Sequence, residues 1–175
     1  MATVKLTDVE RLILANQYAI LGLLKSDEGY IQMAENLRDG HKWLYEQHAT
    51  QISDNLPDED VEHVLCILGI HSDLRDSYSQ LSDKSGIEEH LVHFPGFDGN
   101  NEADLLHFAR ALSRNGNYSE TIGKEARNSH MPTTDMYRRM INEWKSMGEP
   151  RYPLSKETIL RIVGARVHPD NIKSS

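Results

Sequence analysis

The stretch LTDVERLILANQYAILGLLK, residues 6–25, decides the fold, because its start signal and its hydrophobic pattern predict the same long helix. Thr7 followed three residues later by Glu10 is a capping box, in which each side chain bonds the backbone N–H of the other residue. The residues that follow are apolar on nearly every side. Because a helix that is apolar all round is usually buried, we expect a core helix with two or three partner helices.

At roughly 100° per residue, this helix has an aliphatic face with one polar residue, Asn16, in its middle. The aliphatic residues of that face are Val9, Leu12, Ile13, Ile20, Leu23 and Leu24. A second apolar stripe lies nearly opposite and comprises Leu14, Tyr18 and Leu21. A side of small residues, where another backbone can approach closely, comprises Ala15, Ala19 and Gly22. We expect Asn16 to be buried, either as a structural amide or as a ligand contact made together with Gln17 and Tyr18.

Turn residues and capping signals divide the rest of the chain into further helices. The expected helices span about 28–38, 41–52, 57–81, 105–115, 133–147 and 155–164. Residues 91–94 are expected to form a short extended segment before Pro95 and Gly96, and residues 117–132 form a long loop. The predicted fold is therefore all-α, with about six to seven helices in two packed lobes.

Charge is distributed unevenly along the chain. Residues 1–100 carry 7 Lys and Arg against 18 Asp and Glu, a net charge of −11, whereas residues 101–175 carry 12 against 9, a net charge of +3. The sequence also changes character after Gly86, where polar and glycine-rich residues interrupt the helical pattern. We therefore expect an acidic lobe at 1–86 and a mildly basic lobe at 87–175, with one compact domain as the alternative. The difference in charge indicates either solvated faces of unlike composition or docking of the two parts, within one chain or between copies.

The helix expected over 57–81 carries a short heptad seam. One heptad position holds Val64, His71 and Tyr78, and the other holds Ile67, Leu74 and Leu81. Apolar residues at both heptad positions are typical of helix pairing. The seam predicts either packing within the chain or a homodimer contact, and in both cases His71 faces a neighbour.

Composition points to a cytoplasmic protein without a membrane partner. The chain has one cysteine, Cys66, in an apolar run, so no internal disulfide is possible and the thiol is expected to be buried and inert. The first residues lack the apolar run of a signal peptide. No stretch approaches the roughly 20 apolar residues that span a bilayer.

No motif in the sequence specifies a reaction. The densest histidine cluster, Glu88 to His93, matches neither the helical zinc pattern nor a Cys/His finger, so we expect no metal and no cofactor. The sequence also lacks a nucleophile elbow and a phosphate-binding loop. An alternative is a hydrolase or metal-dependent enzyme in the Pro95–Glu102 loop. Such an enzyme would use Asp98 and Glu102 of this loop. It would combine them with Asn16, Gln17 and Tyr18 of the first helix.

A second alternative is weak nucleic-acid binding by the C-terminal helices. The cations that would carry it are Arg138, Arg139, Lys145, Arg151, Lys156, Arg161, Arg166 and Lys173. The helix–loop–helix over 133–163 loosely resembles a helix-turn-helix. Its linker is longer than the usual tight turn, and acidic residues lie in the same stretch, so nucleic acid is not the expected partner.

Four segments resemble the YfbU family of bacterial proteins. They are LTDVERLILANQY at 6–18, GFDGNNEA at 96–103, MYRRMINEW at 136–144 and YPLS at 152–155, and they follow in order along nearly the whole chain. The resemblance implies a mainly helical fold of this length and supplies no catalytic residues. The absence of a reaction motif, the opposite charges of the two halves and the short heptad seam favour a protein that self-associates and acts through protein contacts.

Overall fold

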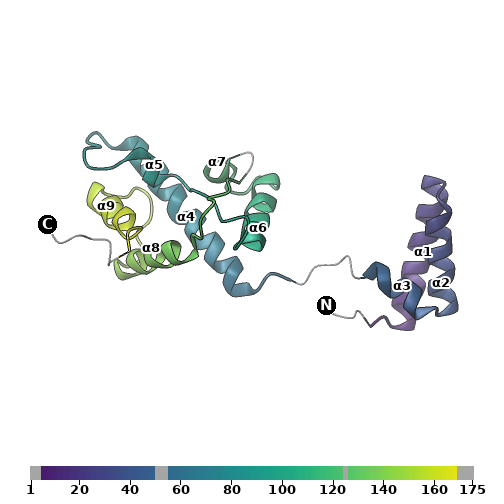
Figure 1. Cartoon of the computed structure of the whole chain (residues 1–175). Helices are drawn as coiled ribbons and strands as arrows, with labels where there is room; N and C mark the ends of the chain where they lie inside the picture. Colours follow the sequence, from purple (N-terminus) through teal and green to yellow (C-terminus); the bar gives the residue numbers. More distant parts are fainter. Residues whose placement is uncertain (1–4, 50–54, 124–125, 169–175) are drawn as a thin grey trace. The chain divides into compact units, whose positions relative to one another are not determined.

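A computed structural model describes residues 5–49, 55–123 and 126–168 (Figure 1). In these residues it contains nine helices and no strand, which confirms the predicted all-α class. The helices are α1 (Asp8–Lys25), α2 (Glu28–Asp39), α3 (Lys42–Ala49), α4 (Asp58–Gln80), α5 (Glu89–Val92), α6 (Ala103–Arg114), α7 (Ser119–Ile122), α8 (Thr134–Ser146) and α9 (Lys156–Gly164). None of these described helices is both long and apolar enough to cross a membrane.

The chain divides into two compact units, unit 1 at Met1–Asn55 and unit 2 at Leu56–Ser175. The expected division after residue 86 therefore differs from the one in the structure. The reason is α4, which contacts α5, α6, α7, α8 and α9 and so belongs with the C-terminal part of the chain. The change in sequence character after Gly86 marks a turn inside unit 2.

Unit 1 is built on the α1–α2 hairpin. The predicted capping box is present, since Thr7 N donates to Glu10 Oε2 at 2.7 Å and Glu10 N donates to Thr7 Oγ1 at 3.3 Å. Asp27 caps α2, which ends at Gly40 in the left-handed conformation. The third helix, α3, contacts α2. Within residues 5–49 the core of this unit is small, because its cluster contains four buried residues, which are Ala15, Met33, Leu37 and Tyr45.

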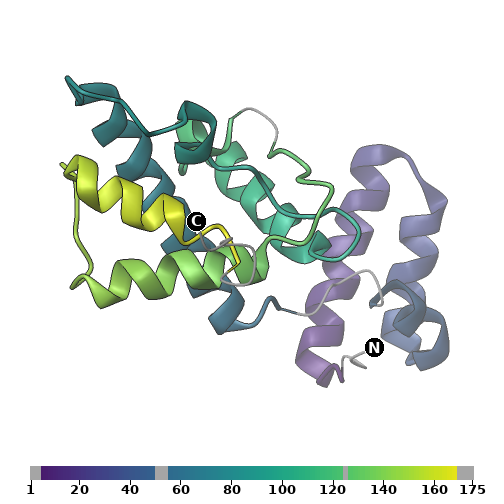
Figure 2. The ribbon, with the colours of Figure 1, turned by 60° about the vertical axis from the view of Figure 1, so that its left-hand side comes forward.

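Unit 2 is organised around α4, whose apolar residues lie inside the core. Both views show α8 and α9 side by side along this unit (Figures 1 and 2). The core cluster includes buried residues of every helix from α4 to α9. Tyr137 on α8 is fully buried, and its ring contacts Phe94 and Phe97 at centroid distances of 5.8 and 5.4 Å.

Two short helices were not predicted, which explains the count of nine instead of six to seven. The segment expected to be extended at 91–94 is wrong in part, because Glu89–Val92 forms the helical turn α5. The loop expected at 117–132 contains α7. Turns this short show no hydrophobic period, so pattern alone does not reveal them. The end of the helix expected at 41–52 falls partly outside the described residues.

Candidate functional site

The aliphatic face of α1 is exposed. We call the six side chains Val9, Leu12, Ile13, Ile20, Leu23 and Leu24 the outer face; they are 51–77% exposed. Within the helix only Ala15 and Gly22 are buried. The expectation that this face lies in the core is therefore wrong.

The small-residue side of α1 is the one that α2 covers. A Cβ on Gly22 would lie 2.4 Å from Ile31 Cδ1, so the two helices approach too closely there for a larger side chain. The second stripe also faces inward, since Leu14 and Tyr18 pack against the small core of the unit. Close approach on one side turns the opposite, aliphatic side outward.

Asn16 lies in the middle of the outer face and is exposed, which corrects the expected buried amide. Its Oδ1 accepts a hydrogen bond from Arg38 Nη2 of α2 at 3.3 Å. Gln17 is also exposed. Because the amide lies among aliphatic side chains, it becomes a buried polar group only when another molecule or segment covers the outer face.

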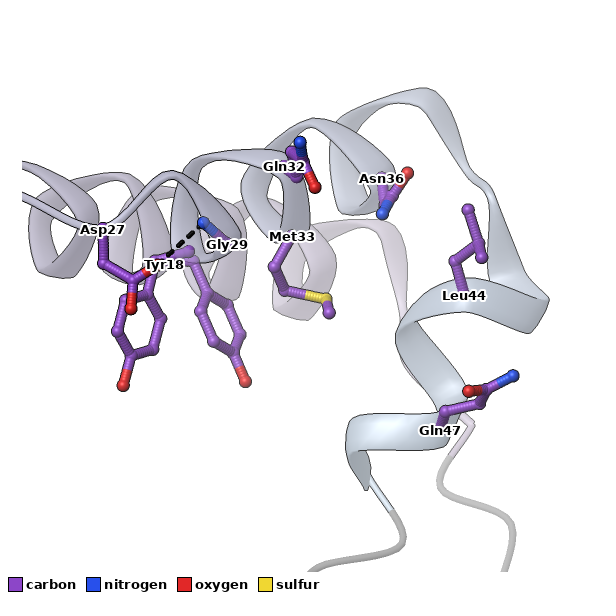
Figure 3. A pocket seen from close by; sticks show the side chains of 9 residues that line it. Tyr18, Asp27, Gly29, Gln32, Met33, Asn36, Leu44 and Gln47 are labelled. Atoms are coloured by element: carbon purple, nitrogen blue, oxygen red, sulfur yellow. Dashed lines mark hydrogen bonds between the residues drawn. The ribbon is translucent and has the colours of Figure 1, made fainter.

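A groove of about 540 Å³ lies on another side of unit 1, between α2 and α3 (Figure 3). Its wall includes Tyr18, whose ring stacks on Tyr30 at a centroid distance of 6.0 Å. Leu44 and Gln47 enter it from α3. Tyr18 is therefore directed into this groove and does not share the outer face with Asn16.

Asp98 and Glu102 lie together in unit 2, where they hold the Pro95–Glu102 loop. Glu102 is 8% exposed, and its carboxylate accepts hydrogen bonds from Asp98 N at 2.8 Å, Thr133 N at 2.7 Å and Thr134 N at 2.6 Å. Burial would raise the pKa of Glu102, but these bonds and those from the two threonine hydroxyls outweigh it, so its pKa is lowered. Glu102 thereby satisfies the first N–H groups of α8, as an N-cap does.

Asp98 is 2% exposed and organises the loop itself. Its Oδ1 accepts from Asn100 N at 3.1 Å, and its Oδ2 accepts from the Asn101 amide. The two carboxylates proposed for an enzyme site are thus occupied by backbone and side-chain donors of the fold. The predicted polar cluster is divided between the units, since Asn16, Gln17 and Tyr18 belong to α1.

The heptad seam of α4 lies inside unit 2. Val64, Ile67, His71 and Leu74 are at most 1% exposed. Tyr78 and Leu81 are partly buried against the same core. The seam therefore follows the intramolecular alternative, because other helices of the same unit already cover its side chains, and it is not a surface on which a second copy can pack.

Most C-terminal cations named for nucleic-acid binding are engaged within unit 2. Arg139 donates to the carbonyls of Ala165 and Arg166 at 3.1 and 2.7 Å, which terminates α9. Arg166 donates to Leu91 O at 2.6 Å. Three further cations form salt bridges, namely Arg138–Asp135, Lys156–Asp83 and Arg161–Glu143. Arg151 lies over the Trp144 ring. Lys173 falls outside the described residues.

The part of the chain that the structure describes shows no recognisable metal or nucleophile site made of histidine and cysteine side chains. Among the described residues, no group of three or more His, Cys, Asp or Glu side chains is placed to hold a metal ion. Cys66, expected to be buried, is only partly buried, and this burial raises the pKa of its thiol.

The orientation of α1 had a signal in the sequence. The small residues Ala15, Ala19 and Gly22 mark the side where a neighbouring backbone comes close, so they also mark the inner side of the helix. The outer face then follows by exclusion. The aliphatic residues indicate the opposite orientation, because six of them on one face are typical of a side that faces a core.

The chain matches the YfbU domain model over residues 4–165. It is 35% identical to a UPF0304 protein of Methanocaldococcus jannaschii, over 91% of this chain and 99% of that protein. It is 31% identical to a UPF0304 protein of Pasteurella multocida and 30% identical to one of Actinobacillus succinogenes, each over 92% of this chain and 99% of the relative.

These features define a two-unit, all-α protein with an exposed aliphatic helix face. The chain belongs to the YfbU family, as its sequence segments predicted. The family match extends across both units and so supports the fold along nearly the whole chain.

Proposed function

We propose that this chain acts through protein contacts and that the outer face of α1 is where two copies associate. The observation that supports the proposal is the exposure of six aliphatic side chains on a helix whose opposite side is already packed against α2. Apart from Asn16, this face carries no polar or charged residue between Val9 and Leu24. Depletion of charge is typical of the core of a protein interface.

The area of the outer face suits a dimer. Six aliphatic side chains, each more than half exposed, present on the order of 600 Å² of apolar surface. This is at the upper end of the roughly 300–600 Å² patch that a monomer exposes. It approaches the roughly 800 Å² that each partner buries in a stable interface. A second copy that lays its own α1 on this face supplies a matching surface.

The small core of unit 1 provides a second reason. Its buried apolar residues are Ala15, Met33, Ala34, Leu37 and Tyr45. Units of roughly 40–60 residues bury too little apolar surface to be very stable alone, and oligomerisation is one of the usual remedies. Covering the outer face would convert α1 into a helix that is buried on both sides, as its sequence predicts.

The test is Leu23→Glu in the full chain. Leu23 is 77% exposed, so the substitution leaves the folded single copy intact, whereas in a dimer it places a carboxylate in an apolar contact. Light scattering should give twice the 20.0 kDa chain mass for the original protein. We expect Leu23→Glu to weaken association at least about tenfold, equivalent to about 1.4 kcal/mol.

Leu160→Glu is the matched control, because it makes the same change at an exposed leucine of α9, outside the outer face. This control should associate as the original protein does. A single-chain mass at every concentration would refute the proposal. Equal association by Leu23→Glu and the original protein would also refute it.

A further inference from the structure

The inference concerns how the two copies pair, and it rests on the proposed self-association. Asn16 lies near the middle of α1, which spans Asp8–Lys25. Three aliphatic residues of the outer face precede it and three follow it. The face is therefore nearly symmetric about its single polar residue. In a two-fold contact a residue on the axis faces its own copy.

The Asn16 amide is suited to pairing with itself. An amide carries one acceptor oxygen with two lone pairs and an NH₂ group with two donors. Arg38 Nη2 occupies one lone pair of Oδ1 and orients the side chain. Two such amides can exchange Nδ2–H···Oδ1 bonds across the axis through the remaining lone pairs. A residue on this face that only donates or only accepts cannot form that exchange.

The two ends of the outer face differ in size, which favours one direction. Val9 stands alone at the N-terminal end, whereas Leu23 and Leu24 form the C-terminal end, each 77% exposed. Antiparallel helices place the narrow end of one copy against the bulky end of the other, so the side chains at the two ends of the helix pair fill a similar volume. Parallel helices would set Leu23 and Leu24 against themselves.

Electrostatics favours the same direction. Helix macrodipoles attract when the helices are antiparallel. The first turn of α1 is acidic, with Asp8 and Glu10, and the last turn contains Lys25. An antiparallel pair brings each acidic first turn beside the basic last turn of the other copy, whereas a parallel pair sets like ends together.

We infer that two copies pair their α1 helices antiparallel, with Asn16 facing Asn16 of the second copy and Val9 facing Leu23. In this arrangement Asn16 determines the register, because any slip leaves a buried amide opposite an aliphatic side chain, whereas the unequal ends of the face and their charges determine the direction. A single polar residue in an apolar helix interface commonly has this role and lowers the affinity in return.

Disulfide trapping in the full chain tests the direction, with Cys66→Ser as background and Asn16 retained. A mixture of the Val9→Cys chain and a mass-tagged Leu23→Cys chain should cross-link between the two chain types. Each variant alone should not cross-link, because Cβ atoms must approach to about 3.5–4.5 Å. Self-linking of Val9→Cys alone would overturn the antiparallel pairing.

Asn16→Leu tests the role of the amide. It should tighten association at least about tenfold and should allow a Leu12→Cys chain to link to a Leu24→Cys chain, since no polar residue then opposes the slipped antiparallel register in which these two positions meet. Gln17→Leu is the matched control, because it adds the same apolar side chain at the neighbouring position of α1, beyond the edge of the outer face, and should retain the original pattern. Retention of that pattern by Asn16→Leu would refute the assigned role.

The two proposals fail differently. If the original chain is monomeric and no cysteine pair links, self-association itself is refuted. If the original chain is dimeric and Leu23→Glu is monomeric, but Val9→Cys links to itself, the proposed function stands and the antiparallel inference is refuted.

Discussion

At the scale of single residues, His71 shows how an apparent interface residue becomes part of a core. It is 1% exposed, and its Nδ1–H donates to Val92 O at 2.9 Å, while Nε2 has no hydrogen-bond partner. Phe94 and Tyr137 contact the ring edge to face. Burial lowers the pKa of His71 to about 4, assisted by the positive charges of Arg166 and His93 and opposed by the Val92 carbonyl. The imidazole is therefore neutral in the folded protein at neutral pH.

This residue makes stability depend on pH. Because the pKa of His71 is about 4 when folded and about 6.5 when unfolded, the unfolded chain binds more protons between these values. The contribution of His71 to stability is fully present above its pKa in the unfolded chain. It is lost as the pH falls towards its pKa in the folded protein. We expect unit 2 to lose roughly 2–3 kcal/mol from this group between pH 7 and pH 4.5.

Urea unfolding of the original chain and of His71→Leu at both pH values measures this contribution. Between pH 7 and pH 4.5 the free energy of unfolding of His71→Leu should fall by roughly 2–3 kcal/mol less than that of the original chain. This difference should appear even if the variant is less stable at neutral pH. An equal loss in both proteins would assign the acid sensitivity to the carboxylates instead.

At the scale of elements, the Pro95–Glu102 loop fastens α8 to the segment before α6. Gly96 has a φ of +100°, and its carbonyl accepts from the Tyr137 hydroxyl at 2.5 Å. Phe97 forms a parallel bridge with Asn128, and Ser129 N donates to Phe97 O at 3.1 Å. The Pro95–Glu102 loop, which the enzyme alternative takes as its site, therefore joins elements that are distant in sequence.

Gly96→Ala should be strongly destabilising. The added Cβ would lie 1.9 Å from Arg127 O, a backbone atom, and the positive φ disfavours any side chain. We expect the free energy of unfolding to fall by about 3 kcal/mol or more. Gly69→Ala is the control within α4, because nothing lies within 4 Å of its added Cβ. It should be neutral or should stabilise by about 0.5–1 kcal/mol. A small effect of Gly96→Ala in urea unfolding would contradict this account of the loop.

At the scale of the whole molecule, the two units differ in the size of their cores. Counted over the described residues, the core cluster of unit 2 has 22 buried apolar residues, whereas that of unit 1 has four. If unit 1 obtains part of its stability from a second copy, mass action couples that stability to protein concentration. The stability of unit 2 is not coupled to protein concentration through α4, because the heptad seam of α4 is already buried.

Calorimetry over a range of protein concentrations should therefore show two transitions with different behaviour. The transition of unit 1 should move to higher temperature as concentration rises, and that of unit 2 should not. Each tenfold increase in protein concentration adds about 1.4 kcal/mol per dimer to the free energy of unfolding of unit 1. In Leu23→Glu the lower transition should no longer move. Concentration-independent transitions in the original chain would contradict a dimer-stabilised unit 1.

The sequence by itself determined the longer helices and where most of them begin and end, but not the short helices α5 and α7. The Thr7 capping box, the stop at Gly40 and the acidic start of α4 act through neighbouring residues, so they can be read without the tertiary structure. The family segments likewise predicted the fold class and the match along the chain.

The tertiary structure alone decided which apolar faces are covered. The sequence pattern shows that α1 and α4 each carry an aliphatic face, but burial depends on which helices lie against that face. The seam of α4 is covered by its own unit. In α1, by contrast, α2 packs against the side that carries Ala15 and Gly22, so the outer face remains exposed. Helix formation depends on local bonds, whereas the surface left for a partner depends on contacts between distant parts of the chain.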